Sequence, residues 1–193
     1  MIGSRNSLPW REGVRMSILV LVCVGGLACH AERQQNALEA KSRDAAVETL
    51  GRYLQLRLSN AHWNEYSKFI TWPDEPAWDC KWVISKYDIR PSKKEGKKVT
   101  VPVVYMRLGL FCNKPQFEPS PKVVTVNYEL VKRPSGWKVD GPTPDYPEIS
   151  ADVLMRSLMA LAEKRGEAPE RRAKAEATAR KIGEALQRSR SWQ

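Results

Sequence analysis

The sequence has few of the residue types from which catalytic and metal sites are usually built. It contains two histidines and four cysteines, and it has no glycine-rich loop of the kind that holds phosphates. His30 lies beside a predicted cleavage point, and His62 stands alone between Ala61 and Trp63. One histidine without a spare cysteine supplies neither a metal site nor a nucleophile–base pair. We therefore expect no catalytic residue, no metal and no cofactor; the enzyme alternative would use His62 as a general base.

Long hydrophobic runs are also missing. The longest apolar segment, residues 17–28, would span about 18 Å as a helix, whereas the hydrocarbon core of a membrane is about 30 Å thick. Arginines precede this segment and small residues end it (Arg5, Arg11 and Arg15; Gly25, Gly26 and Ala28). This order of positive, apolar and small residues predicts a signal peptide over residues 1–28 rather than a transmembrane helix.

The stretch "GGLAC", residues 25–29, resembles the lipobox of bacterial lipoproteins, in which the cysteine is acylated and becomes the first residue of the mature chain. Gly26 departs from that pattern, which usually has leucine at this position. The resemblance implies a lipid on Cys29 that attaches the protein to a membrane of the cell envelope, facing the periplasm or the exterior. Ordinary cleavage after Ala31, giving a secreted soluble protein, is the alternative, and translation from Met16 is a further one.

The cysteine count is consistent with export. Cys23 leaves with the signal peptide and Cys29 takes the lipid, so Cys80 and Cys112 remain as an even pair in an oxidising compartment. We expect them to form a disulfide that closes a loop of about 33 residues. The alternative is two free buried thiols.

The charge balance is strongly basic. The net charge is +10, and residues 78–140 contain 13 Lys and Arg against 6 Asp and Glu. The interpretation that we favour is a solvated, soluble surface; the alternative is attraction to anionic lipid head groups or other anionic polymers of the envelope, and no nucleic acid is expected as partner. The lysine cluster 93–98 lies at a predicted hairpin tip, where it can contact such a surface or simply keep the turn soluble.

Helical periodicity appears at both ends of the mature chain. Apolar residues predict a helix over 44–58, with Glu48, Arg52 and Arg57 off its apolar stripe (Val47, Leu50, Leu54 and Leu58). Asn60 is expected to cap a second short helix that carries Trp63, Tyr66, Phe69 and Ile70. Ser150 caps a later helix that runs to about Arg165. The last segment, 169–190, has the composition of a solvated helix that contributes little to the core.

Between these helices lie four segments with strand character, at 81–89, 99–112, 123–131 and 137–139. In the second segment Val104, Met106, Leu108 and Leu110 are expected to share one face of the strand. In the third, Val124, Val126, Tyr128 and Leu130 are expected to point inward. The turn-like "PSKKEGKK" predicts a hairpin in which Arg90 pairs with Val99.

This order predicts an α+β fold, with N-terminal helices packed on a curved antiparallel sheet of about four strands and C-terminal helices appended. The expected domains are a signal peptide at 1–28, a tether or early helix at 29–43, an α+β roll domain at 44–147 and a helical extension at 148–193. Residues 44–147, ending in "YELVKRPSGWKVDG", resemble the nuclear transport factor 2-like superfamily, which includes ketosteroid isomerase. That resemblance implies a cone-shaped roll enclosing a pocket. Because Asp88, Glu129 and Asp140 are not expected to face inward, no catalytic acid is carried over.

Aromatic residues are the most informative candidates for a binding site. The candidate ligand-binding residues are aromatic side chains from the short second helix and the sheet (Trp63, Tyr66, Trp82, Tyr105, Tyr128 and Trp137). A pocket lined by them would suit a small apolar ligand or an envelope protein, whereas the interpretation that aromatic residues favour in a small domain is that these rings fill the core. The sequence therefore favours a lipid-anchored, non-catalytic binding protein; an isomerase-like or hydrolase-like enzyme and a structural polymer-binding protein are the alternatives.

Overall fold

The computed structural model describes residues 13–74, 76–113 and 116–190, with side chains from residue 36 onward. The chain falls into two compact units, Met1–Ser42 and Arg43–Gln193. Most of the first unit belongs to helix α1 (Gly13–Leu58), so the backbone of residues 29–43 is helical. The first twelve residues of the expected signal peptide, and the side chain of Cys29, lie outside the described part. Within the described residues no helix is both long and apolar enough to cross a membrane.

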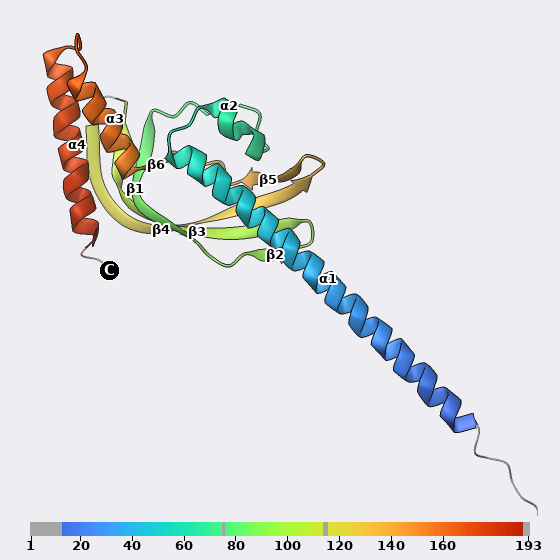
Figure 1. The fold of residues 1–193 in the computed structure, drawn as a ribbon. Helices are drawn as coiled ribbons and strands as arrows, with labels where there is room; N and C mark the ends of the chain where they lie inside the picture. Colours follow the sequence, from blue (N-terminus) through green and yellow to red (C-terminus); the bar gives the residue numbers. More distant parts are fainter. Residues whose placement is uncertain (1–12, 75, 114–115, 191–193) are drawn as a thin grey trace, which may run out of the picture. The chain divides into compact units, whose positions relative to one another are not determined.

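The second unit is built on a curled mixed sheet of six strands, which confirms the α+β class and corrects the expected strand number (Figure 1). The spatial order is β5 (Gly136–Gly141), β4 (Gln116–Arg133), β3 (Lys98–Cys112), β1 (Cys80–Ile89) and β6 (Glu148–Ser150), and β2 (Lys93–Glu95) pairs with β3. β6 runs parallel to β1, and the other pairs are antiparallel. The sequence missed β2 and β6 because three residues are too few to show a period of two.

One hydrophobic core lies between the sheet and the last turns of α1. Leu50, Leu54 and Leu58 are buried there, as their helical spacing predicted. From β3 the buried side chains are those of Val99, Val101, Val103 and Tyr105. The set that was predicted to share one face of β3 (Val104, Met106, Leu108 and Leu110) does not belong to this core. Both alternating sets of β3 residues are largely apolar, so the alternation could not distinguish the two faces. In β4 the prediction is confirmed for Tyr128 and Leu130, which are buried.

A second core forms where helices α3 (Ala151–Glu163) and α4 (Pro169–Arg190) pack on the sheet (Figure 1). Consecutive residues of β1 point to opposite faces of the sheet, so that Val83 belongs to this second core and Ile84 to the first. The buried α4 side chains are Ala175, Thr178, Ala179, Ile182, Ala185 and Ser189. The expectation that the last segment adds little to the core is therefore wrong. Its apolar stripe consists mostly of alanines, which a search for large apolar residues overlooks. Ser150 is the N-cap of α3, as predicted.

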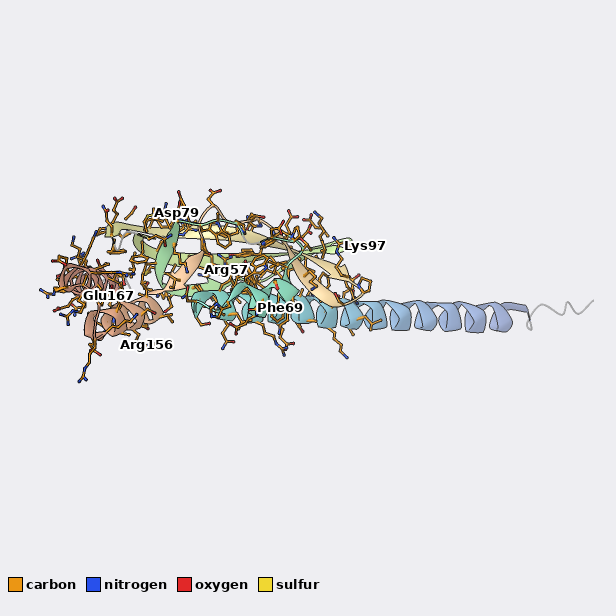
Figure 2. The ribbon with its side chains drawn as sticks, turned by 90° about the horizontal axis from the view of Figure 1, so that it is seen from above. Arg57, Phe69, Asp79, Lys97, Arg156 and Glu167 are labelled. Carbon is orange, nitrogen blue, oxygen red and sulfur yellow. A yellow bond between two sulfur atoms is a disulfide. The ribbon has the colours of Figure 1, made fainter. Side chains whose placement is uncertain are left out.

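The predicted disulfide between Cys80 and Cys112 is confirmed. The two cysteines are directly opposite each other in the β1–β3 ladder, and Ile89 is opposite Val103 at its other end. Arg90 therefore does not pair with Val99. The first residues of β3 pair with β2 instead, with Lys94 opposite Val99. In the chain-entropy view a bridge across a loop of this size stabilises the fold by about 3–4 kcal/mol. The lysine-rich turn lies at the hairpin tip, and Lys97 is exposed there (Figure 2).

The segment after α1 also differs from its prediction. Asn60 has a φ of 59°, a left-handed conformation that follows the end of α1, so it does not cap the next helix. That helix, α2 (Trp63–Tyr66), has His62 at its N-cap and continues as a single 3₁₀ turn over Ser67–Phe69. The backbone N–H of His62 donates to Glu65 Oε1 at 2.8 Å, which supports the first turn.

The second core yields a direct test of the role of α4. Ile182 is fully buried, so we expect Ile182→Ala to lower the free energy of unfolding by about 2–5 kcal/mol through lost packing and a cavity. The neighbouring Lys181 is exposed, and Lys181→Ala should change it by less than about 0.5 kcal/mol. Urea denaturation of the full chain measures both. Equal, small effects of the two substitutions would show that α4 is not part of the folded core.

Candidate binding site

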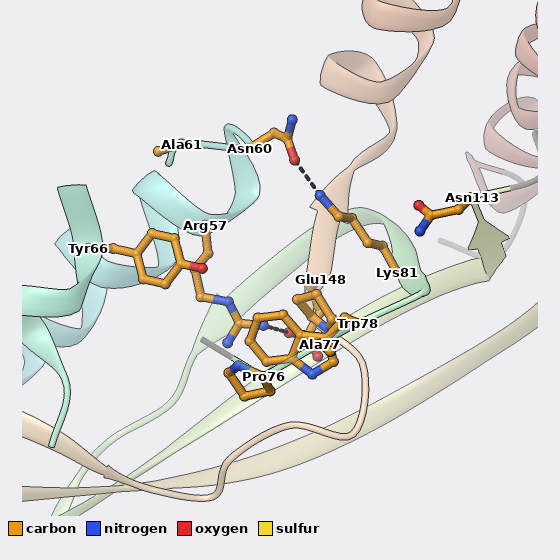
Figure 3. Close-up of a pocket in the computed structure, with 11 residues that line it drawn as sticks. Arg57, Asn60, Ala61, Tyr66, Pro76, Ala77, Trp78, Lys81, Asn113 and Glu148 are labelled. Carbon is orange, nitrogen blue, oxygen red and sulfur yellow. Dashed lines mark hydrogen bonds and ion pairs between the residues drawn. The ribbon is translucent and has the colours of Figure 1, made fainter. Parts of the chain in front are cut away.

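A pocket of about 410 Å³ opens between the end of α1, the loop before β1 and the start of β6 (Figure 3). Its lining combines cationic, amide and aromatic side chains with one carboxylate. The lining residues are Arg57, Asn60, Ala61, Tyr66, Pro76, Ala77, Trp78, Lys81, Asn113, Pro147 and Glu148. Four separate stretches of chain therefore supply the pocket, at 57–66, 76–81, 113 and 147–148, and the fold brings them together.

Arg57 lies at the innermost part of this site. It occupies the last turn of α1, four residues after Tyr53, and its side chain is 2% exposed. Its Nη1 donates to the Tyr53 hydroxyl and its Nη2 donates to Glu148 Oε2 at 3.1 Å. Figure 3 shows the side chain reaching from the helix toward Glu148 and Trp78. The prediction that Arg57 stands off the apolar stripe is wrong, because it is buried with that stripe.

Glu148 holds two arginines at once. It is the first residue of β6, and its side chain is 3% exposed. Oε2 accepts from Arg57, and Oε1 accepts from Arg107 Nη2 at 2.8 Å. Arg107 comes from β3 and is 12% exposed. We call these three residues the Arg–Glu–Arg cluster; it joins the end of α1, the middle of the sheet and the short parallel strand.

Aromatic rings contact both arginines of the cluster. The guanidinium carbon of Arg57 lies 5.2 Å from the Tyr53 ring centre and 5.8 Å from that of Trp78. Arg107 lies 4.7 Å from the Trp82 ring centre. Trp78 is itself held by its indole N–H, which donates to the carbonyl of Pro144 at 3.1 Å. These contacts stabilise the arginines as cations without supplying a negative charge.

Three tyrosines lie beneath the pocket in the first core. The Tyr105 and Tyr128 hydroxyls are 2.9 Å apart, and the Tyr53 ring meets the Tyr128 ring edge-on at 6.3 Å between centres. Burial is the largest cause that raises the pKa of each of the three tyrosines. The pKa of Tyr105 is raised further by the neighbouring Tyr128, and that of Tyr128 by the charge of Glu148. For Arg57, burial works against the charged form, but Tyr53, Tyr128 and Glu148 outweigh it and raise its pKa. The site therefore holds charged arginine beside neutral tyrosines.

The six aromatic residues proposed from the sequence do not gather around this pocket. Tyr66 lines it, and the Trp63 ring packs against Tyr66 at 5.4 Å between centres. Tyr105, Tyr128 and Trp137 are buried in the first core, while Trp82 is half-buried beside Arg107. Sequence reasoning missed the Arg–Glu–Arg cluster. A signal existed for Arg57, which follows Leu54 by three residues and Leu50 by seven and so shares their helix face.

The acid and histidine candidates lie outside the pocket. His62 is exposed at the start of α2 and is not part of the lining. The side chains of Asp88, Glu129 and Asp140 are 60%, 48% and 30% exposed, and each lies near a lysine or arginine. Within the described ranges no cluster of three or more His, Cys, Asp or Glu side chains could hold a metal ion. The polar chemistry that this pocket offers is therefore charge pairing and hydrogen bonding.

The tyrosine environment predicts how stability depends on pH. In the folded chain the pKa values of Tyr53, Tyr105 and Tyr128 lie above the ordinary 10.0, so the unfolded chain releases these protons first. The contribution of these three hydroxyls to the free energy of unfolding is complete below about pH 10 and is lost as the pH rises further. Urea denaturation between about pH 9 and pH 11 should show a falling free energy of unfolding, with a shallower fall for Tyr105→Phe. A constant free energy of unfolding across this range would contradict the burial of these hydroxyls.

Comparisons with protein-family models, with curated proteins and with solved structures found no match for this chain. The resemblance to the nuclear transport factor 2-like superfamily thus stays a prediction from sequence and element order. What the chain does has to be argued from its own site.

Proposed function

We propose that this chain is an exported, lipid-anchored envelope protein that binds a small ligand in the pocket between α1, the loop before β1 and β6. The observation that carries the proposal is a pocket with buried, convergent charged groups at its base and aromatic rings on its wall. Binding is the activity that these groups support, since they offer charge pairing, hydrogen bonds and ring contacts.

The size and make-up of the pocket fit a small molecule. Its volume of about 410 Å³ falls within the range of ordinary ligand sites, about 300–1,000 Å³. Tyr66 and Trp78 supply apolar surface, while Asn60, Asn113 and Lys81 supply polar groups around it. A few polar groups set in an apolar wall are what fixes a ligand's orientation in such sites.

The export part of the proposal has separate support. The Cys80–Cys112 disulfide is of the kind that persists in oxidising compartments. Anchoring through a lipid on Cys29 rests on the lipobox-like "GGLAC" alone. Two acyl chains on one residue would keep the protein at the membrane, because each buried methylene contributes about 0.8 kcal/mol.

Ligand binding is tested by thermal unfolding of the full chain against a library of small water-soluble molecules. We expect at least one compound to raise the melting temperature and to bind at least about tenfold more weakly to Trp78→Ala, since this substitution removes a ring of the pocket wall. Tyr87→Ala is the matched control, because Tyr87 is exposed on β1 away from this pocket. A library without any stabilising compound, or compounds that bind both variants equally, would overturn the proposal.

Anchoring is tested by the intact mass of the protein extracted from membranes. We expect a chain that begins at Cys29 and carries acyl groups, and we expect Cys29→Ser to move the protein to the soluble fraction. An unmodified chain that begins at Glu32 would show ordinary signal cleavage instead.

A further inference from the structure

The Arg–Glu–Arg cluster carries more positive than negative charge; its Arg57 and Glu148 line the pocket, whereas Arg107 is not among the lining residues. The Arg–Glu–Arg cluster has two guanidinium groups and one carboxylate, a net charge of +1, and its side chains are between 2% and 12% exposed. Lys81 adds a second cation to the pocket lining, where it donates to Asn60 Oδ1.

A buried charge without a counter-charge is costly, because the protein interior screens and solvates it poorly. The neighbouring tyrosines do not cancel it, since burial keeps Tyr53, Tyr105 and Tyr128 in the neutral form. Both oxygens of Glu148 are already engaged by the two arginines. Around the cluster, the described lining of the pocket holds no second carboxylate. The cluster with its excess positive charge thus adjoins the pocket through Arg57, the residue at which a ligand can reach it.

Arg57 also keeps donor capacity. A guanidinium has five N–H groups, and Arg57 uses one for Tyr53 and one for Glu148. Its Nε is buried without a hydrogen-bond partner. A planar carboxylate is the group that best matches such a fork of donors, because it accepts two parallel hydrogen bonds and brings one negative charge.

Building on the proposed function, we propose that the ligand is a small carboxylate with an aromatic or other apolar body. Its carboxylate pairs with Arg57 and neutralises the Arg–Glu–Arg cluster. Its body lies against Trp78, which is half-buried in the wall next to Arg57 (Figure 3). The single excess charge of the cluster selects a monoanion over a neutral molecule of the same shape.

The experiment compares matched acids and amides on the full chain by isothermal titration calorimetry. The probes are benzoate with benzamide, phenylacetate with phenylacetamide, and indole-3-acetate with indole-3-acetamide. For at least one pair we expect the acid to bind at least about tenfold more tightly than its amide, since only the acid forms a charge-assisted pair with Arg57. Inorganic phosphate, an anion without an apolar body, should bind more weakly than that acid.

A variant locates the effect. Arg57→Gln should abolish the preference for the acid, whereas Lys86→Gln, the same charge change at a residue of β1 outside this pocket, should preserve it. Near-ultraviolet circular dichroism reports whether Arg57→Gln is folded. If Arg57→Gln is not folded, the salt dependence of binding to the unaltered chain serves as the test instead. Added salt should weaken binding of the acid and leave binding of the amide unchanged.

The outcomes separate the two proposals. Equal binding of acids and amides, or a preference that survives in folded Arg57→Gln, would overturn the anionic ligand and leave the pocket's binding function in place. If none of the six probes binds while library compounds still bind in a way that depends on Trp78, the anionic ligand is likewise overturned and the binding function stays. Failure of the probes and of the library together would overturn both proposals.

Discussion

One carboxylate shared between two arginines is the constraint on which this structure depends. Glu148 begins the short strand β6 and accepts from Arg57 at the end of α1 and from Arg107 in β3. Because all three side chains are nearly removed from solvent, their charges cannot be left unpaired without a large loss of stability. Pairing therefore requires the end of α1, the sheet and β6 to meet at one place, and the pocket is the space that this meeting leaves.

The other elements hold the partners of this cluster in position. α1 is fixed by the first hydrophobic core, where Leu50 and Leu54 pack against the inner residues of β3 and β4. β6 is fixed by its parallel pairing with β1 and by the second core, into which Ile149 points. The disulfide joins the open end of the β1–β3 hairpin, next to the loop that carries Trp78. Two cores and one covalent bond thus support a site that is polar at its base.

Much of the fold follows from short-range patterns in the sequence, whereas the site does not. The spacing of Leu50, Leu54 and Leu58 and the alternation in β4 were sufficient to predict the helix-on-sheet arrangement, and the even cysteine pair was sufficient to predict the disulfide. β3 is apolar on both faces, so its orientation depended on which helices cover each side, and α4 buries a stripe of alanines that resembles a solvated helix. Glu148 and Arg57 are 91 residues apart, and no local pattern links them. Only the folded chain shows that their charges meet.

A double-mutant cycle between Arg57 and Glu148 measures this interaction most directly. The free energy of unfolding would be determined by urea denaturation for the unaltered chain, for Arg57→Met, for Glu148→Leu and for the double variant. If the two side chains form a buried pair, Glu148→Leu leaves both Arg57 and Arg107 without their carboxylate. Removing Arg57 as well leaves one buried unpaired charge fewer, so the effects should fall short of additivity by about 1–3 kcal/mol. Additive effects, within about 0.5 kcal/mol, would show that Arg57 and Glu148 do not interact and would remove the charged base of the pocket.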